Sequence, residues 1–209
     1  FFQAEDGIRD TSVTGVQTCA LPISEIAAGA GPHRQRDSGL IATWVRFEED
    51  ARATAWREVG RGAWDLHGAR SFDVTGRLIG GCVETMANLA GTPYGDVRAF
   101  GEEHAEDGLI VYLEVSDDAA PAICRNLHGL RLAGWFEHAR AVLVGRTNAP
   151  GTPQLSQRDA VLDALGRLDL PIVFDLEIGH VPPHLPLVNG ALAHVVVDGE
   201  RREITQHLV

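Results

Sequence analysis

Two residues in this sequence combine a chemically useful side chain with a position at the end of an apolar run. Glu114 ends the run Gly108-Leu-Ile-Val-Tyr-Leu-Glu114, and His180 follows the run that starts at Pro171. Each run predicts a buried strand, and α/β proteins commonly build their sites at the carboxyl ends of such strands. A carboxylate and an imidazole presented in this way are two of the three groups of a hydrolytic triad.

Both residues also have a purely structural interpretation. A glutamate at the end of a strand is usually solvated, and a loop histidine is often satisfied by a backbone carbonyl. The five apolar residues before Glu114 favour a functional role for this carboxylate. Pro182 and Pro183 favour one for His180, because prolines fix φ and would hold the ring in place.

A metal site is a rival interpretation of the same region. His180 and His184, with Asp175 or Glu177 nearby, offer the ligand types that zinc uses. The paired-histidine geometry of a helix is excluded, because two prolines separate the two histidines. We therefore expect no metal and no cofactor, and keep a metal-dependent hydrolase as an alternative.

Several other residues invite a functional role but have simpler explanations. The glycine pair Gly80-Gly81 favours a turn before a helix over a close approach to a ligand. The others are expected to pack or to face solvent: Trp44, Trp56 and Trp64 as packing residues, Cys82 and Cys124 as small core residues, and Glu84 as a solvated side chain.

Composition limits the class of protein. The chain has 209 residues, of which 44% are hydrophobic, enough for one globular domain. A formal charge of -11 argues against nucleic acid or an anionic membrane as partner. No apolar run reaches the length of a membrane-spanning helix. The 3 cysteines have no CxxC spacing, which indicates a reducing compartment and a cytoplasmic location.

The expected elements predict an α/β domain with a mixed sheet. Their order implies parallel strands joined by crossover helices, followed by an antiparallel hairpin at the C-terminus around Asp198-Gly199. The expected elements are a helix at 40–59, a loop at 60–76, a strand at 77–82, a helix at 83–90, a strand at 109–114, a helix capped by Asp117 and running to 130, a strand at 139–144, a helix at 157–168, a strand at 171–176, and hairpin strands at 191–197 and 201–206.

The chain divides into three parts. Residues 1–24 resemble a translated sequencing adapter, and they lack both regular periodicity and the basic start and apolar middle of a signal peptide. Residues 25–40 are rich in Gly, Ala and Arg and predict a linker. Residues 41–209 are expected to form the domain.

The sequence resembles the C-terminal half of the LD-carboxypeptidase family of serine peptidases. This family includes muropeptide carboxypeptidases and microcin C self-immunity peptidases. The matching stretches are Gly31-Pro-His33, Gly76–Cys82, Leu89-Ala-Gly-Thr92, Ile110–Glu114, Leu132-Ala-Gly-Trp135 and Gly179–Gly190.

The resemblance assigns roles to the two residues singled out above. The family triad runs Ser, Glu, His along the chain, and the matching positions here are Glu114 and His180. The family serine belongs to an N-terminal domain, which we expect to be missing from this sequence. The serines outside residues 1–24, none of which has the context of a nucleophile elbow, are Ser38, Ser71, Ser116 and Ser156. Cys82 stands where the family often has Asn.

The resemblance also implies an activity. Family members hydrolyse the amide to a terminal D-Ala of murein tetrapeptides during peptidoglycan recycling, and are commonly homodimers. The immunity branch instead cleaves a peptidyl or aminoacyl nucleotide, and the tryptophans between residues 31 and 76 hint at this branch. We expect a peptide substrate, a homodimer at full length, and no activity from the chain as it stands. A non-catalytic domain that binds a peptide or nucleotide is a further alternative.

Overall fold

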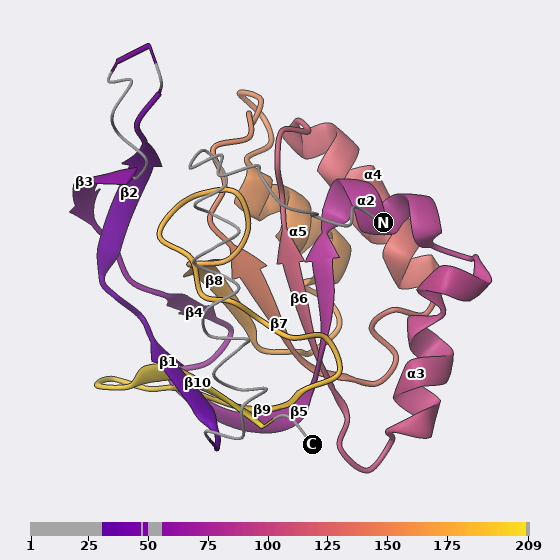
Figure 1. The fold of residues 1–209 in the computed structure, drawn as a ribbon. Coiled ribbons are helices and arrows are strands. Elements are labelled where there is room, and N and C mark those ends of the chain that lie inside the picture. The colour runs from indigo at the N-terminus through magenta and orange to yellow at the C-terminus, as the bar shows by residue number, and fades with distance from the viewer. Residues whose placement is uncertain (1–30, 47, 50–55, 208–209) are drawn as a thin grey trace, which may run out of the picture.

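An eight-stranded mixed sheet forms the centre of the molecule (Figure 1). The computed structural model describes residues 31–46, 48–49 and 56–207. The strand order is β1-β10-β9-β5-β6-β7-β8-β4, and β2 and β3 pair separately. The strands are β1 (His33–Arg36), β2 (Leu40–Trp44), β3 (Trp56–Arg61), β4 (Asp65–His67), β5 (Phe72–Cys82), β6 (Leu109–Glu114), β7 (Ala139–Gly145), β8 (Ile172–Leu176), β9 (Leu192–Val197) and β10 (Arg202–His207).

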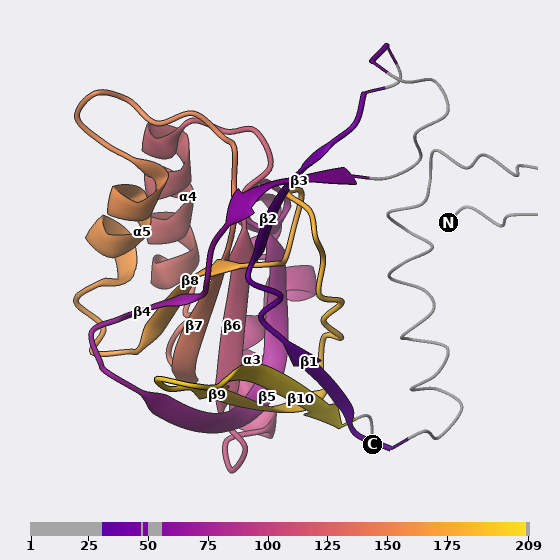
Figure 2. The ribbon, with the colours of Figure 1, turned by 90° about the vertical axis from the view of Figure 1, so that its left-hand side faces the viewer.

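The four central strands, β5 to β8, run parallel to one another. Their connections contain α2 (Val83–Leu89), the 3₁₀ turn η2 (Pro93–Gly95), α3 (Val97–Glu103), α4 (Ala120–Leu132) and α5 (Gln157–Leu165). Because parallel strands need crossover connections, helices follow β5, β6 and β7 in turn. Helices α4 and α5 lie on one face of the sheet, and the segment between β8 and β9 lies on the other (Figure 2).

Successive side chains of β6 point alternately into two separate apolar clusters. Leu109, Val111 and Leu113 pack against the helices, whereas Ile110 and Tyr112 belong to the cluster on the opposite face. Both clusters are buried, so the strand reads as a continuous apolar run in the sequence. By the same alternation, Glu114 leaves the strand on the face opposite the helices.

The predicted fold class is confirmed. The expected strands at 109–114, 139–144 and 171–176 correspond to β6, β7 and β8, and the expected hairpin corresponds to β9 and β10. Helix α4 begins later than expected, with Ala119 rather than Asp117 at its N-cap. Among the described residues, no helix has both the length and the apolar character needed to cross a bilayer.

The helix expected at 40–59 is wrong. Its ends form β2 and β3, which lie side by side as an antiparallel pair (Figure 1). Trp44 lies opposite Trp56 in this pair. Most of β3 is exposed, so burial imposes no clean period of two on its sequence. The expected loop at 60–76 likewise contains β4 and the start of β5. The domain boundaries stay predictions, although β1 pairs with β10 and so places residues 33–36 in the main sheet.

Candidate functional site

Glu114 and His180 are in direct contact. His180 Nδ1 lies 2.7 Å from Glu114 Oε2. The carboxylate side chain is only 9% exposed and the imidazole is 56% exposed, so a buried anion orients a ring that solvent can reach. A neutral ring that donates its Nδ1 proton to the carboxylate carries a lone pair on Nε2. The pair can therefore accept a proton from a group outside it.

Two glycines make room for the carboxylate. Gly179 has φ +95°, and a Cβ there would lie 2.6 Å from Glu114 Oε2. A Cβ on Gly145, the last residue of β7, would collide with the Ile178 carbonyl and would lie 3.1 Å from Glu114 Cβ. Gly145 is not among the site residues predicted from the sequence, although a glycine that ends an apolar strand is a recognisable sign of close approach.

Trp44 connects the β2–β3 pair to the segment that carries His180. Its Nε1 donates to the His180 carbonyl at 3.0 Å, and its ring stacks on His184 with centroids 5.4 Å apart. Trp44 is 40% exposed and Trp56 is 37% exposed, whereas Trp64 is buried. The packing role predicted for all three tryptophans therefore holds fully only for Trp64.

Glu177 is a fully buried anchor rather than a metal ligand. It accepts hydrogen bonds from the Ser38 backbone at 2.9 Å, from the Ser38 hydroxyl, and from Trp64 Nε1 at 3.0 Å. The His184 ring stacks on the Trp44 ring. Burial lowers the pKa of His184. In the described part of the chain, His180 and His184 do not form a cluster of three ligand atoms with Asp175 or Glu177. The zinc alternative therefore lacks its ligand set here.

The glycine pair lies inside β5 rather than in a turn. A Cβ on Gly80 would collide with the backbone of Tyr112 on the neighbouring strand. Gly80 also exchanges two hydrogen bonds with the Asn189 side chain, at 3.0 and 3.2 Å. The pair thus permits a close approach of backbone to backbone, and it fastens the segment after His180 to β5.

Glu84 is partly buried and hydrogen-bonded, rather than freely solvated as expected. One of its oxygens accepts the backbone N–H groups of Ser116, Asp117 and Asp118 at 2.9, 3.1 and 3.1 Å. The other oxygen accepts from the Cys82 thiol at 3.1 Å. Burial, reinforced by Glu84, raises the pKa of Cys82 to about 11. Cys82 is thus a half-buried protonated thiol. Cys124 is half-buried as well, so the prediction that both cysteines are core residues is wrong.

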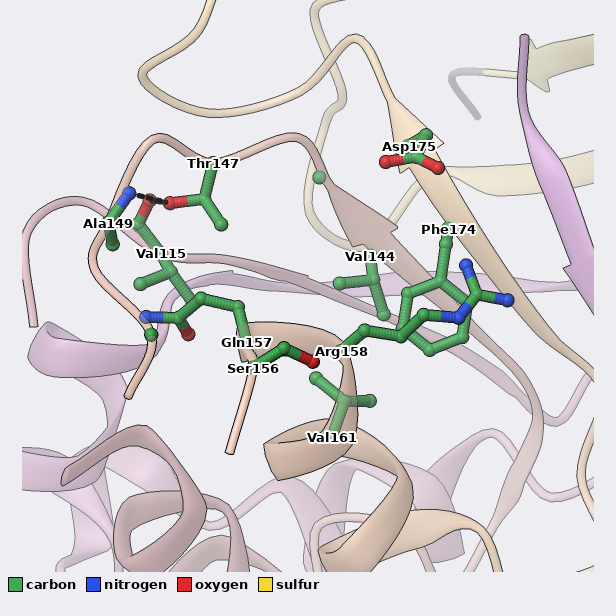
Figure 3. A pocket seen from close by; sticks show the side chains of 12 residues that line it. Val115, Val144, Thr147, Ala149, Ser156, Gln157, Arg158, Val161, Phe174 and Asp175 are labelled. Carbon is green, nitrogen blue, oxygen red and sulfur yellow. Dashed lines mark hydrogen bonds between the residues drawn. The ribbon is translucent and has the colours of Figure 1, made fainter. Parts of the chain in front are cut away.

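A separate cavity of about 380 Å³ opens on the helix face of the sheet (Figure 3). Val144, Val161 and Phe174 give it apolar walls, and the Arg158 guanidinium lies 4.0 Å from the centre of the Phe174 ring. Ser156 at its edge forms the N-cap of α5. Glu114 and His180 do not line this cavity, since they lie on the opposite face of the sheet.

A family model for the LD-carboxypeptidase C-terminal domain matches residues 75–195. The chain belongs to the LD-carboxypeptidase family. It is 30% identical over 159 residues to a predicted carboxypeptidase of Streptomyces coelicolor, covering 74% of this chain and 48% of that protein. The chain therefore spans about half the length of this relative.

Solved structures share the fold. An MccF-like protein from Streptococcus pneumoniae in complex with AMP has a TM-score of 0.64 at 23% identity, over 90% of this chain and 57% of that one. Muramoyltetrapeptide carboxypeptidase from Oxalobacter formigenes has a TM-score of 0.61 at 16% identity, over 90% and 54%. The microcin C7 self-immunity protein MccF in complex with aspartyl sulfamoyl adenosine has a TM-score of 0.67 at 17% identity, over 86% and 51%.

Proposed function

We propose that this chain supplies the glutamate and histidine of a Ser-Glu-His triad in a serine carboxypeptidase. The 2.7 Å contact between His180 Nδ1 and Glu114 Oε2 is the observation that carries the proposal. His180 Nε2 takes the proton of the serine and later passes it to the leaving amine. Glu114 holds the ring in the required tautomer and stabilises the imidazolium that forms.

The nucleophile comes from a part of the protein outside this sequence. Three serines of the chain already have structural partners: Ser38 binds Glu177, Ser116 binds Asp117, and Ser156 caps α5. The chain spans about half the length of its relative, and we propose that the serine lies in the half that it does not cover. The 209-residue chain alone should therefore be inactive.

The substrate proposed first is a murein tetrapeptide, cut at the amide to its terminal D-Ala. Family membership and the shared fold of muramoyltetrapeptide carboxypeptidase support this choice. A peptidyl or aminoacyl nucleotide is the second candidate, and one observation favours it. The half-exposed Trp44 indole lies beside His180, where a nucleobase could stack. A cytoplasmic location and a homodimer at full length remain predictions.

The test is to recover the complete gene and assay the full-length protein on both substrate classes by mass spectrometry. We expect release of D-Ala, and a loss of several orders of magnitude in Glu114→Gln and His180→Gln. The matched control is His194→Gln, which breaks a histidine–carboxylate contact of 2.5 Å with Asp73 elsewhere on the surface. Release of D-Ala by the purified 209-residue chain would contradict the location assigned to the nucleophile.

A further inference from the structure

Three potential metal ligands converge between helices α4 and α5. Cys124 and His128 lie four residues apart on α4, and Asp163 lies on α5. The Cys124 thiol lies 3.3 Å and His128 Nε2 lies 2.9 Å from the same oxygen, Oδ2 of Asp163. All three ligand atoms lie within 4.8 Å of one another, and within the described residues no other group of three does so.

The arrangement suits a tetrahedral ion. Residues four apart on a helix present their side chains on one face, so Cys124 and His128 reach the same point. In a zinc site the bonds are about 2.0–2.3 Å long, which sets neighbouring ligand atoms about 3.3–3.8 Å apart. The two hydrogen bonds to Asp163 need to lengthen only slightly to reach that spacing. The site is partly exposed, so an ion can enter and a water can complete its coordination.

We propose that Cys124, His128 and Asp163 form a binding site for Zn²⁺ or a similar divalent ion that clamps α4 to α5. On binding, the Cys124 thiol releases its proton to solvent and becomes a thiolate. The neutral His128 ring moves its proton from Nε2 to Nδ1, and Asp163 binds as the carboxylate that it already is. One ion is thus exchanged for one proton, and the ligands contribute two negative charges.

The electrostatics of the site set its affinity. A hydrogen bond from His128, and another from Cys124, lower the pKa of Asp163, so this ligand is ready. Burial and the Asp163 hydrogen bond raise the pKa of Cys124, so the ion itself must displace the thiol proton. Arg131 Nη2 lies 3.1 Å from His128 Nδ1, the atom that must accept a proton, so this arginine opposes binding.

The site shares no residue with the Glu114–His180 pair and lies on the other side of the sheet, among the helices. Its test is therefore independent of the peptidase proposal. The full 209-residue chain is titrated with CoCl₂ and followed by absorption, because cobalt bound to a thiolate gives a strong near-ultraviolet band. ZnCl₂ is then added to displace the cobalt.

We expect a thiolate–cobalt band that saturates at one equivalent, disappears on zinc addition, and is lost in Cys124→Ser. Zinc binding should weaken about tenfold or more in His128→Gln and Asp163→Asn. Cys82→Ser is the control for thiol content, and should keep the band. Arg131→Met should bind zinc more tightly, because the competing donor is gone.

Asp163→Asn keeps the proposal testable if other variants are poorly folded, since its side chain is 61% exposed. At the same zinc concentration, the melting temperature should rise clearly more in the wild-type chain than in Asp163→Asn. Absence of the cobalt band at one equivalent, or a band that persists in Cys124→Ser, overturns the proposal. So does an equal rise in melting temperature in both proteins.

Discussion

Gly179 determines how closely the segment after β8 can approach the Glu114 carboxylate. Gly179 has a φ of +95°, a conformation that costs free energy in any residue with a side chain. The absence of a Cβ also leaves the space that Glu114 Oε2 fills. His180 follows directly, so the backbone turn at Gly179 also sets the direction of the imidazole. One glycine therefore serves both the conformation and the contact.

Gly179→Ala should destabilise the protein and separate His180 from Glu114. The destabilisation has two causes, the left-handed backbone conformation and the clash of the added Cβ. Gly190→Ala isolates the first cause, because Gly190 has φ +86° but nothing within 4 Å of an added Cβ. We expect Gly190→Ala to cost about 1–2 kcal/mol for the left-handed conformation. Gly179→Ala should cost about 1–3 kcal/mol more, from the clash with the carboxylate. The measurement is the free energy of unfolding in urea, and equal losses in the two variants would contradict the close approach.

At the scale of elements, the sequence predicts what burial imposes. Strands β6, β7 and β8 are apolar along most of their length, and α5 carries its apolar residues at helical spacing, so both were recognisable. The pair β2–β3 was not, because its exposed residues leave no periodic signal and its pairing is made by backbone groups.

The site shows the same division. Glu114 and His180 were identified from their positions after buried strands, but the contact between them joins residues 66 apart in sequence. That contact depends on how the strands align and on the space left by Gly145 and Gly179. Neither the strand alignment nor this space can be read from the local sequence. The sequence therefore predicts the two groups, and only the fold shows that they are in contact.

Glu84 links the start of α2 to the segment after β6, and we expect its removal to loosen that segment. Glu84→Ala leaves three backbone N–H groups, at Ser116, Asp117 and Asp118, without their acceptor. The expected loss is about 1–3 kcal/mol, with faster amide exchange at these three residues. Glu102→Ala is the control, because its ion pair with Arg98 is exposed and should change stability by at most about 1 kcal/mol.

The same contact has a pH dependence. Burial alone would raise the pKa of Glu84, but hydrogen bonds from Cys82 and from the backbone outweigh it and lower the pKa below 4.5. A lowered pKa means that the contribution of Glu84 is present above pH 4.5 and is lost as the pH falls below it. Wild type and Glu84→Ala should therefore converge in stability in acid. A difference that stays constant would show that the charge is not involved.

At the scale of the whole molecule, the composition isolates the alkaline titration. All 18 basic residues are arginine, which stays protonated throughout the accessible range. The side chains that lose protons in alkali are therefore 2 tyrosines and 3 cysteines. Tyr112 is partly buried, beside β5 and Asn189, whereas Tyr94 is 89% exposed.

Tyr112 should make the protein less stable as the pH rises from 10 to 12. Burial raises the pKa of Tyr112 from 10.0 to about 12, so the folded state keeps a proton that the unfolded state has lost. Under linkage, the free energy of unfolding then falls with pH across this window, by about 2 kcal/mol. Cys82, with a pKa raised from 9.0 to about 11, acts in the same direction from a lower pH. Urea unfolding at several pH values should show a shallower fall in Tyr112→Phe and an unchanged one in Tyr94→Phe. If Tyr112→Phe falls as steeply as wild type above pH 10, the hydroxyl of Tyr112 is not held in its protonated form by the fold.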